Sequence, residues 1–188
     1  MSQNTWKQTL ITSQVDGAAL TNSAVAASIL PPAAKFALPS NLCQIGMKMQ
    51  LKASGRISTV VTTPGTLLLD VRLGATTVIF NTGAMNLNVT AQTNASWELD
   101  LDLIVRSIGS GTVATILGTG KFSSRALIGS AAVAAGYGSV AVVPDTAPAV
   151  GTGFDSTATN VVDMFGTWSV ANAANSILVH QYELVLCN

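Results

Sequence analysis

Charged residues are scarce in this sequence. Only 10% of the 188 residues are Asp, Glu, Lys or Arg, and nine cationic residues balance nine acidic ones, whereas an ordinary soluble domain carries roughly 25% charged residues. With no net charge and no basic run, nothing is available to neutralise a phosphate backbone, so we expect no nucleic-acid partner. A free monomer usually keeps more charge for solubility. We therefore expect much of the surface to lie against copies of the chain or a larger assembly.

Long apolar runs and helical periods are also missing. No stretch approaches the roughly 18 apolar residues of a membrane-spanning helix, so we expect no membrane partner. The opening residues, MSQNTWKQTL, show neither the basic nor the apolar region of a secretory signal, which fits a protein that assembles in a cytoplasm. No long stretch repeats with a helical period, which argues against a helical bundle.

Side chains that support catalysis or metal binding are few. The sequence has one histidine, His180, and two cysteines, Cys43 and Cys187. A zinc site needs three or four ligands, and neither a Gly-x-Ser-x-Gly motif nor a phosphate-binding loop is present. We therefore expect no metal, no cofactor and no enzymatic activity. Two free thiols are the simpler expectation for the cysteines, although spacing alone leaves a disulfide open.

The pattern that is present has a period of two residues. In WELDLDLIVR, Glu98, Asp100 and Asp102 alternate with apolar residues, so the three carboxylates share one face of a strand. Lys48, Lys52 and Arg72 occupy the polar positions of other alternating segments. We interpret the carboxylates as the solvated face of a sheet, paired with cations across strands, and not as a catalytic pair.

Similar alternation, separated by Gly, Pro and Asn, predicts about eight strands. Alternation with frequent turns predicts an all-β fold, an antiparallel β-sandwich, and favours a jelly roll. The expected strands lie near residues 7–15, 45–55, 66–73, 76–81, 97–108, 112–124, 161–171 and 176–187.

Two segments lack the alternation. Residues 28–43 contain three prolines, which remove ladder donors, so we expect residues 1–45 to form an N-terminal arm with a first strand, followed by a single sandwich domain over 46–188. Residues 129–160 are rich in Gly and Ala, and so long a loop indicates contact with a neighbour. The candidate interface residues in these segments are Trp6, Pro31, Pro32, Phe36, Tyr137 and Phe154.

Three segments, residues 63–87, 93–122 and 148–188, resemble a group of proteins encoded in the structural modules of tailed bacteriophages. Those proteins end similarly, with a Trp-containing strand, an Asn-Ser turn and a last strand that holds a His-Gln pair. The matching residues here are Trp168, Asn175, Ser176, His180 and Gln181. The resemblance implies a virion component of β-sandwich type: a capsid decoration (cement) protein, or a minor head or tail protein.

A decoration protein of this kind implies a homotrimer that binds the major capsid protein or other virion proteins. Residues 1–45 would then act as a clamp arm, and loss of residues 1–40 would leave the sandwich folded. Three arms bound together would gain avidity of about 10²–10⁴ over one arm. The alternative is a tail or fibre module that binds a receptor or carbohydrate, with Tyr137 and Phe154 as contacts. An RNA-packaging coat protein would carry a basic arm, which this N-terminus lacks.

Overall fold

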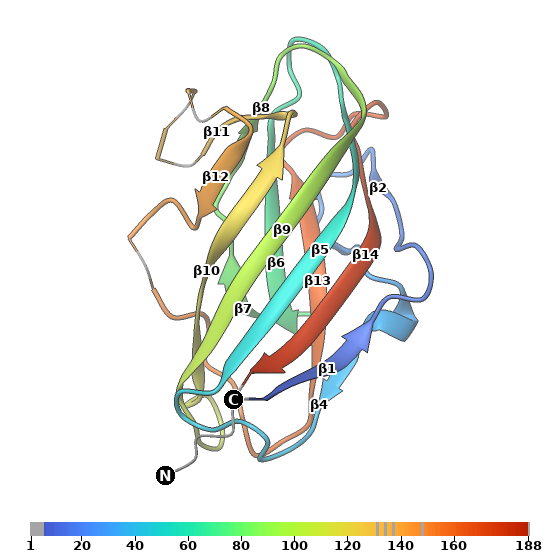
Figure 1. Cartoon of the computed structure of the whole chain (residues 1–188). Helices are drawn as coiled ribbons and strands as arrows, with labels where there is room; N and C mark the ends of the chain where they lie inside the picture. Colours follow the sequence, from blue (N-terminus) through green and yellow to red (C-terminus); the bar gives the residue numbers. More distant parts are fainter. Residues whose placement is uncertain (1–5, 131, 134, 137, 148, 188) are drawn as a thin grey trace.

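The computed structural model describes residues 6–130, 132–133, 135–136, 138–147 and 149–187. Over these residues the chain forms fourteen strands and one 3-10 turn, arranged as two packed sheets (Figure 1). The elements are β1 (Lys7–Thr12), β2 (Leu20–Thr21), β3 (Ala27–Ser28), η1 (Pro32–Ala34), β4 (Phe36–Leu38), β5 (Lys48–Thr59), β6 (Thr66–Leu73), β7 (Thr77–Asn81), β8 (Met85–Leu87), β9 (Gln92–Ser107), β10 (Thr115–Ser124), β11 (Leu127–Gly129), β12 (Val140–Val143), β13 (Asn160–Trp168) and β14 (Ser176–Cys187).

Every strand pair is antiparallel. The first sheet, called sheet A, has the order β1-β14-β5-β9-β10-β12, and β2 also pairs with β14. The second, sheet B, has the order β11-β8-β6-β13-β3, with β4 paired to β13 and β7 paired to β6. The predicted antiparallel β-sandwich is confirmed.

The strand order is that of a jelly roll, as the alternation pattern favoured. The chain runs from β1 in sheet A to β3 and β4 in sheet B, back to β5, across to β6, β7 and β8, then to β9, β13 and β14. Four strands, β1, β14, β5 and β9, therefore face β3–β4, β13, β6 and β8, which is the eight-stranded, double Greek-key arrangement. The strands β10, β11 and β12 are an addition between β9 and β13.

Alternation along β9 builds much of the core. Trp97, Leu99, Leu101 and Leu103 are at most 2% exposed, while Glu98, Asp100 and Asp102, which alternate with them, face outward. The Trp97 ring stacks on Phe122 of β10, with ring centroids 6.0 Å apart. Its indole N–H lies 3.2 Å from the carbonyl oxygens of Arg56 and Leu178, so the polar atom of this buried ring is satisfied.

A β-bulge changes which residues of β14 face the core. Val179 pairs with Gly55 and Gln181 with Ser54, so His180 is an extra residue in the ladder. Because one extra residue inverts the alternation, Val179 and Tyr182 are both buried, whereas His180 is half-buried. His180 and Tyr182, although two residues apart, therefore do not share a face of the sheet.

Residues 7–45 belong to the sandwich and contribute β1 to β4 and the turn η1. β1 pairs with β14 along one edge of sheet A, and β3 and β4 pair with β13 in sheet B. Ile29, Leu30 and Leu38 are no more than 2% exposed. The described part of this segment is therefore not a separate arm, and we expect its removal to unfold the sandwich.

Part of the segment 129–160 packs against the sandwich of its own chain instead of extending towards a neighbour. It contains β12, which pairs with β10, and the Gly151 N–H donates to the Ile116 carbonyl at 2.9 Å. The Thr152 N–H donates to the Val78 carbonyl at 2.7 Å, so residues 151–152 connect β10 of sheet A to β7 of sheet B. A Cβ on Gly151 would lie 2.3 Å from the Ile79 carbonyl oxygen, so this approach requires glycine.

Candidate functional site

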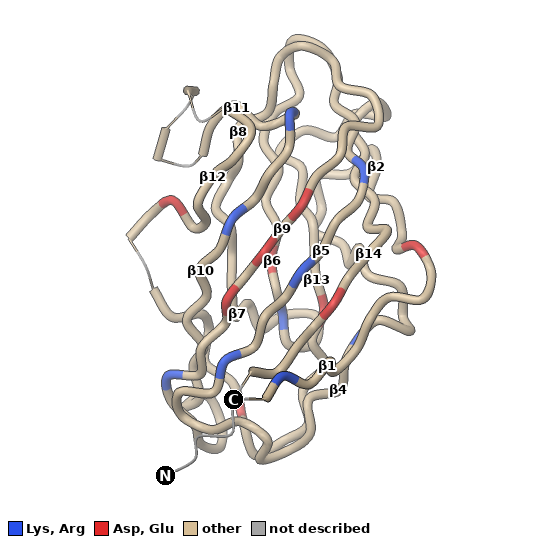
Figure 2. Tube along the Cα trace, in the orientation of Figure 1, with Lys and Arg blue, Asp and Glu red and all other residues tan. Residues whose placement is uncertain are grey.

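More than half of the charged residues lie on the outer face of sheet A (Figure 2). They form rows of alternating sign across the strands, with acidic residues along β9 between cationic residues on β5 and β10. The members are Lys7, Lys48, Lys52, Arg56, Glu98, Asp100, Asp102, Arg106, Lys121 and Glu183.

Cross-strand pairing on this face is confirmed for two lysines. Lys48 Nζ lies 2.9 Å from Asp102 Oδ2, and Lys52 Nζ lies 3.8 Å from Asp100 Oδ2. Desolvation raises the pKa of Asp102, but hydrogen bonds from Lys48 and Gln50 and the charges of Lys48 and Lys7 outweigh it, so the pKa lies below its usual value. Asp100 and Asp102 are thus paired on a solvated face, and Glu98 shares that face without an ion pair among the described residues.

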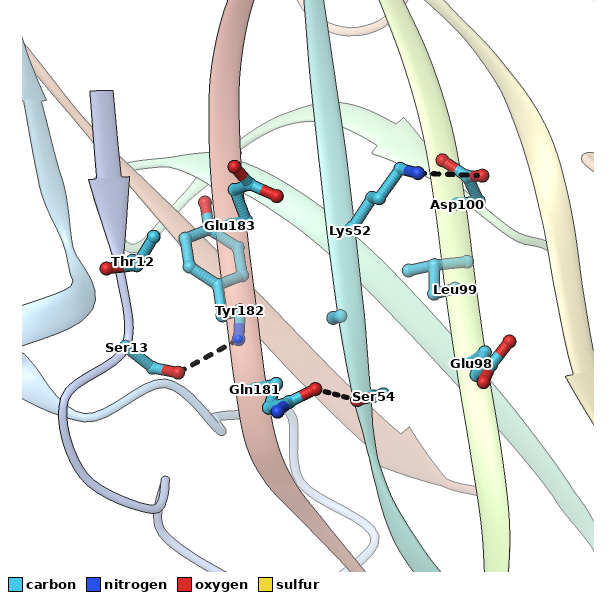
Figure 3. A pocket seen from close by; sticks show the side chains of 11 residues that line it. Thr12, Ser13, Lys52, Ser54, Glu98, Leu99, Asp100, Gln181, Tyr182 and Glu183 are labelled. Atoms are coloured by element: carbon cyan, nitrogen blue, oxygen red, sulfur yellow. Dashed lines mark hydrogen bonds and ion pairs between the residues drawn. The ribbon is translucent and has the colours of Figure 1, made fainter. Parts of the chain in front are cut away.

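A depression of about 550 Å³ opens on the same face, between β1, β14, β5 and β9 (Figure 3). Ser13 Oγ accepts the Tyr182 N–H at 2.9 Å, and Ser54 Oγ donates to Gln181 Oε1 at 3.4 Å. Hydroxyls, an amide, an ammonium and carboxylates therefore surround one open space. The lining residues are Thr12, Ser13, Lys52, Ala53, Ser54, Glu98, Leu99, Asp100, Gln181, Tyr182 and Glu183.

The aromatic rings beside this depression are buried. Trp97 is 1% exposed and Tyr182 2% exposed. Burial, together with the negative charge of Asp163, raises the pKa of Tyr182 above its ordinary range. The polar groups of the depression can bind hydroxyls, but neither ring is available for stacking on a sugar.

The charges of sheet B are neutralised within the chain. Arg72 Nη2 lies 2.6 Å from Asp70 Oδ2, and Lys35 Nζ lies 2.7 Å from Asp163 Oδ2. Both carboxylates are at most 7% exposed. Arg72 also lies 4.3 Å over the Phe165 ring. Arg72 was expected to pair across strands, but its partner Asp70 lies on the same strand. Both carboxylates of these pairs are neutralised by a neighbouring cation.

One end of the sandwich, which we call the far end, is formed by four loops, residues 22–26, 60–65, 88–91 and 169–175, and none of them contains a charged residue. These loops lie at the end opposite the N-terminus (Figures 1 and 2). The Thr62 N–H donates to the Val89 carbonyl at 2.7 Å and thereby joins two of them. Val25, Val61 and Val89 are 73%, 54% and 55% exposed. The far end is thus an uncharged surface with exposed aliphatic side chains.

Buried Asn175 holds the far end together. Its Oδ1 accepts the Val60 N–H at 2.9 Å, and its Nδ2 donates to the Pro64 carbonyl at 3.0 Å. The residue is 0% exposed. One side chain thus connects the loop 169–175 to the loop 60–65.

The structure does not gather the predicted interface residues into one site. Trp6 and Pro32 are exposed, Phe36 is half-buried at the edge of sheet B, and Pro31 is buried. Phe154 is 3% exposed and pairs with Ala114, so its ring belongs to the core and the expectation of an exposed contact is wrong. Tyr137 lies outside the described residues.

Sequence reasoning missed the far end. The signal in the sequence was four uncharged turn segments that each contain a valine. The structure shows that these valines, Val25, Val61, Val89 and Val170, are exposed. These segments are far apart in sequence, and only the jelly-roll topology brings them to one end.

Within the described residues, no group of three or more His, Cys, Asp and Glu side chains is placed to hold a metal ion. Both cysteines are free, and burial raises the pKa of the Cys43 thiol. Among the described residues, none of the helical segments has the length and apolarity to cross a bilayer.

Comparisons with family models and with curated proteins gave no match. A solved structure of the CBM2 module of the evolved Dit of Lactobacillus casei BL23 phage J-1 is similar at 9% sequence identity and a TM-score of 0.34. The similarity covers 82% of this chain and 68% of that chain. The fold described above rests on the strand pairing of this chain and not on that likeness.

Proposed function

We propose that this protein is a structural component of a bacteriophage virion and acts through protein–protein contacts rather than catalysis. The sequence resemblance to phage structural modules supports the virion assignment, and jelly rolls are common among viral capsid proteins. The observation that carries the contact role is the far end, where exposed valines lie on loops without any charge. Exposed apolar patches with this composition are typical of protein–protein contacts.

Within the virion, we propose a capsid decoration protein that assembles as a homotrimer. An uncharged surface can meet a copy of itself without electrostatic repulsion, which supports contact between far ends of sister chains. Because residues 7–45 lie in the sandwich, binding to the major capsid protein would depend on the surface of the assembled trimer and not on free arms. Several modest contacts on one trimer still act together through avidity.

Electron microscopy of purified particles, combined with labelling by antibodies against this chain, tests the proposal. We expect density and label on the outer shell at three-fold positions. Absence of the chain from purified particles would contradict the virion assignment. Label confined to the tail tip would contradict capsid decoration and support the second candidate below.

The second candidate is a carbohydrate-binding module of a tail or fibre, and the polar depression on sheet A favours it. Its hydroxyls, amide and carboxylates can hydrogen-bond to sugar hydroxyls, although the nearby rings are buried. Screening on a glycan array compares the wild type with Gln181→Ala, which shortens an exposed lining residue. Binding that this substitution removes supports the candidate, and an array without bound glycans contradicts it.

A further inference from the structure

A second depression, of about 330 Å³, adjoins the first on the outer face of sheet A, and the two share Glu98. Arg56 approaches it from β5 and Arg125 from the turn between β10 and β11, and β9 lies between them. Two guanidinium groups therefore border one opening. The other lining residues are Asn94, Ser96, Trp97, Ser123 and Ser124.

Backbone carbonyls of β9 orient both arginines. Arg56 Nη1 donates to the Asn94 carbonyl at 3.4 Å and to Ser96 Oγ, and Arg125 Nη2 donates to the Thr93 carbonyl at 3.3 Å. These acceptors are neutral, so they fix the guanidinium groups without cancelling their charge.

Neither arginine makes an ion pair with an acid of the described chain. Lys48 and Lys52, on the same face, both do. Glu98 borders the depression, but it faces Ser54 and Ser123 across the strands. The two arginines are thus oriented cations with unused donors.

We infer that this depression binds an oxyanion, the carboxylate or phosphate group of an acidic or phosphorylated saccharide. A guanidinium group offers a planar fork of donors that matches such groups bidentately. Asn94, Ser96 and Ser123 supply amide and hydroxyl groups for the sugar hydroxyls next to the anion.

The charges of the adjoining depression determine which way round the saccharide binds. Its acidic residues, Asp100, Glu183 and the shared Glu98, outnumber its one cation, Lys52, so it disfavours a second anion and accepts hydroxyl-rich parts of a saccharide chain. The acidic group therefore lies at the arginine end. This inference needs neither the virion assignment nor binding of neutral sugars, so it can fail or hold independently of both.

Isothermal titration of the full chain with phosphate, glucose 6-phosphate, glucuronate and glucose, at one low ionic strength set with NaCl, tests the inference. We expect saturable binding of the three anions, tightest for the two saccharides, and none of glucose. Replacing both arginines (Arg56→Gln with Arg125→Gln) should raise the Kd at least about tenfold. Lys121→Gln, on the same face but outside both depressions, is the matched control and should leave the Kd unchanged.

Three results would overturn the inference: no saturable anion binding, equal binding of glucose, or an unchanged Kd in the double variant. Phosphate that binds as tightly as glucose 6-phosphate would overturn the saccharide part. If the double variant does not fold and shows no thermal transition, the single variant Arg125→Gln, which changes an exposed turn residue, provides the test instead. It should weaken anion binding several-fold with the transition retained.

Discussion

The far end and the outer face of sheet A differ in the number of charged residues that they carry. The far end has exposed valines on four loops without a charged residue, whereas sheet A carries more than half of the charges, arranged in rows of alternating sign. An average of 10% charged residues therefore describes neither surface. The difference indicates that a charge-poor chain need not be covered everywhere: the far end is suited to contact with protein, and sheet A to water and polar ligands.

We expect the largest effect from removing the N-terminal segment, which contributes one loop of the far end and part of the core. Deleting residues 1–40 removes the loop 22–26 and several buried aliphatic side chains, each worth about 1.5–3 kcal/mol. Such a loss is comparable to the roughly 5–15 kcal/mol that stabilises a domain. We expect the truncated chain to be unfolded by circular dichroism, and a cooperative melting transition would show instead that 1–40 is a dispensable arm.

Charge placed on the far end should break association without unfolding the chain. Val61 and Val89 are exposed, so the double variant Val61→Asp with Val89→Asp should change the free energy of unfolding by less than about 1 kcal/mol in total. In an interface, the same carboxylates would be desolvated without a partner. Light scattering after size exclusion should show the mass falling to that of a monomer.

The control for this pair is Thr119→Asp with Lys121→Asp, on the charged face of sheet A. Both residues are exposed, and the change adds acidic charge far from the loops of the far end. The mass should remain that of the oligomer. Dissociation by the control pair, with the far-end pair still assembled, would reverse the roles assigned to the two surfaces.

Within the far end, Asn175→Ala should have the next largest effect. It leaves the Val60 N–H and the Pro64 carbonyl without their buried partner, at about 1–3 kcal/mol for each unsatisfied group. Urea denaturation should show this loss as a lower midpoint with an unchanged slope. Asn172→Ala, in the same loop, removes only a local bond to the Ala174 N–H and should cost less than half as much.

On sheet A, Asp102→Asn should have the smallest effect, about 0.2–1 kcal/mol, because Lys48 and Asp102 are partly exposed. The folded-state pKa of Asp102 is lowered, so its contribution to stability is complete above the ordinary pKa of an unfolded aspartate and is lost as the pH falls through the lower folded value. Denaturation at pH 7 and at pH 2 should show a difference from wild type only at pH 7. A larger difference at pH 2 would contradict this sign.

The alternation of single segments was sufficient to predict the main strands, the sandwich and the outward position of Glu98, Asp100 and Asp102. It could not predict the bulge at His180, because an extra residue in a ladder leaves no mark on composition. Prolines at 31, 32 and 39 indicated a segment without a long strand, but only the pairing of β3 and β4 with β13 shows that this chain is part of a sheet.

The candidate surfaces were harder to predict than the fold, because each combines distant segments. The far end joins residues from 22 to 175, and the second depression joins Arg56 to Arg125 across β9. Neither arginine stands out in sequence, since both are isolated cations. Phe154 shows the opposite error: an aromatic residue in a Gly-rich loop suggests a contact, but its bridge to Ala114 places it in the core.

Oxidative footprinting of the full chain, at a concentration where it is assembled and after dilution to the monomer, tests the central claim most directly. The account predicts that assembly protects Val61, Val89 and Val170, while oxidation of peptides from the outer face of sheet A stays the same. Protection of sheet A with an unchanged far end, or a chain that stays monomeric at every concentration, would contradict it.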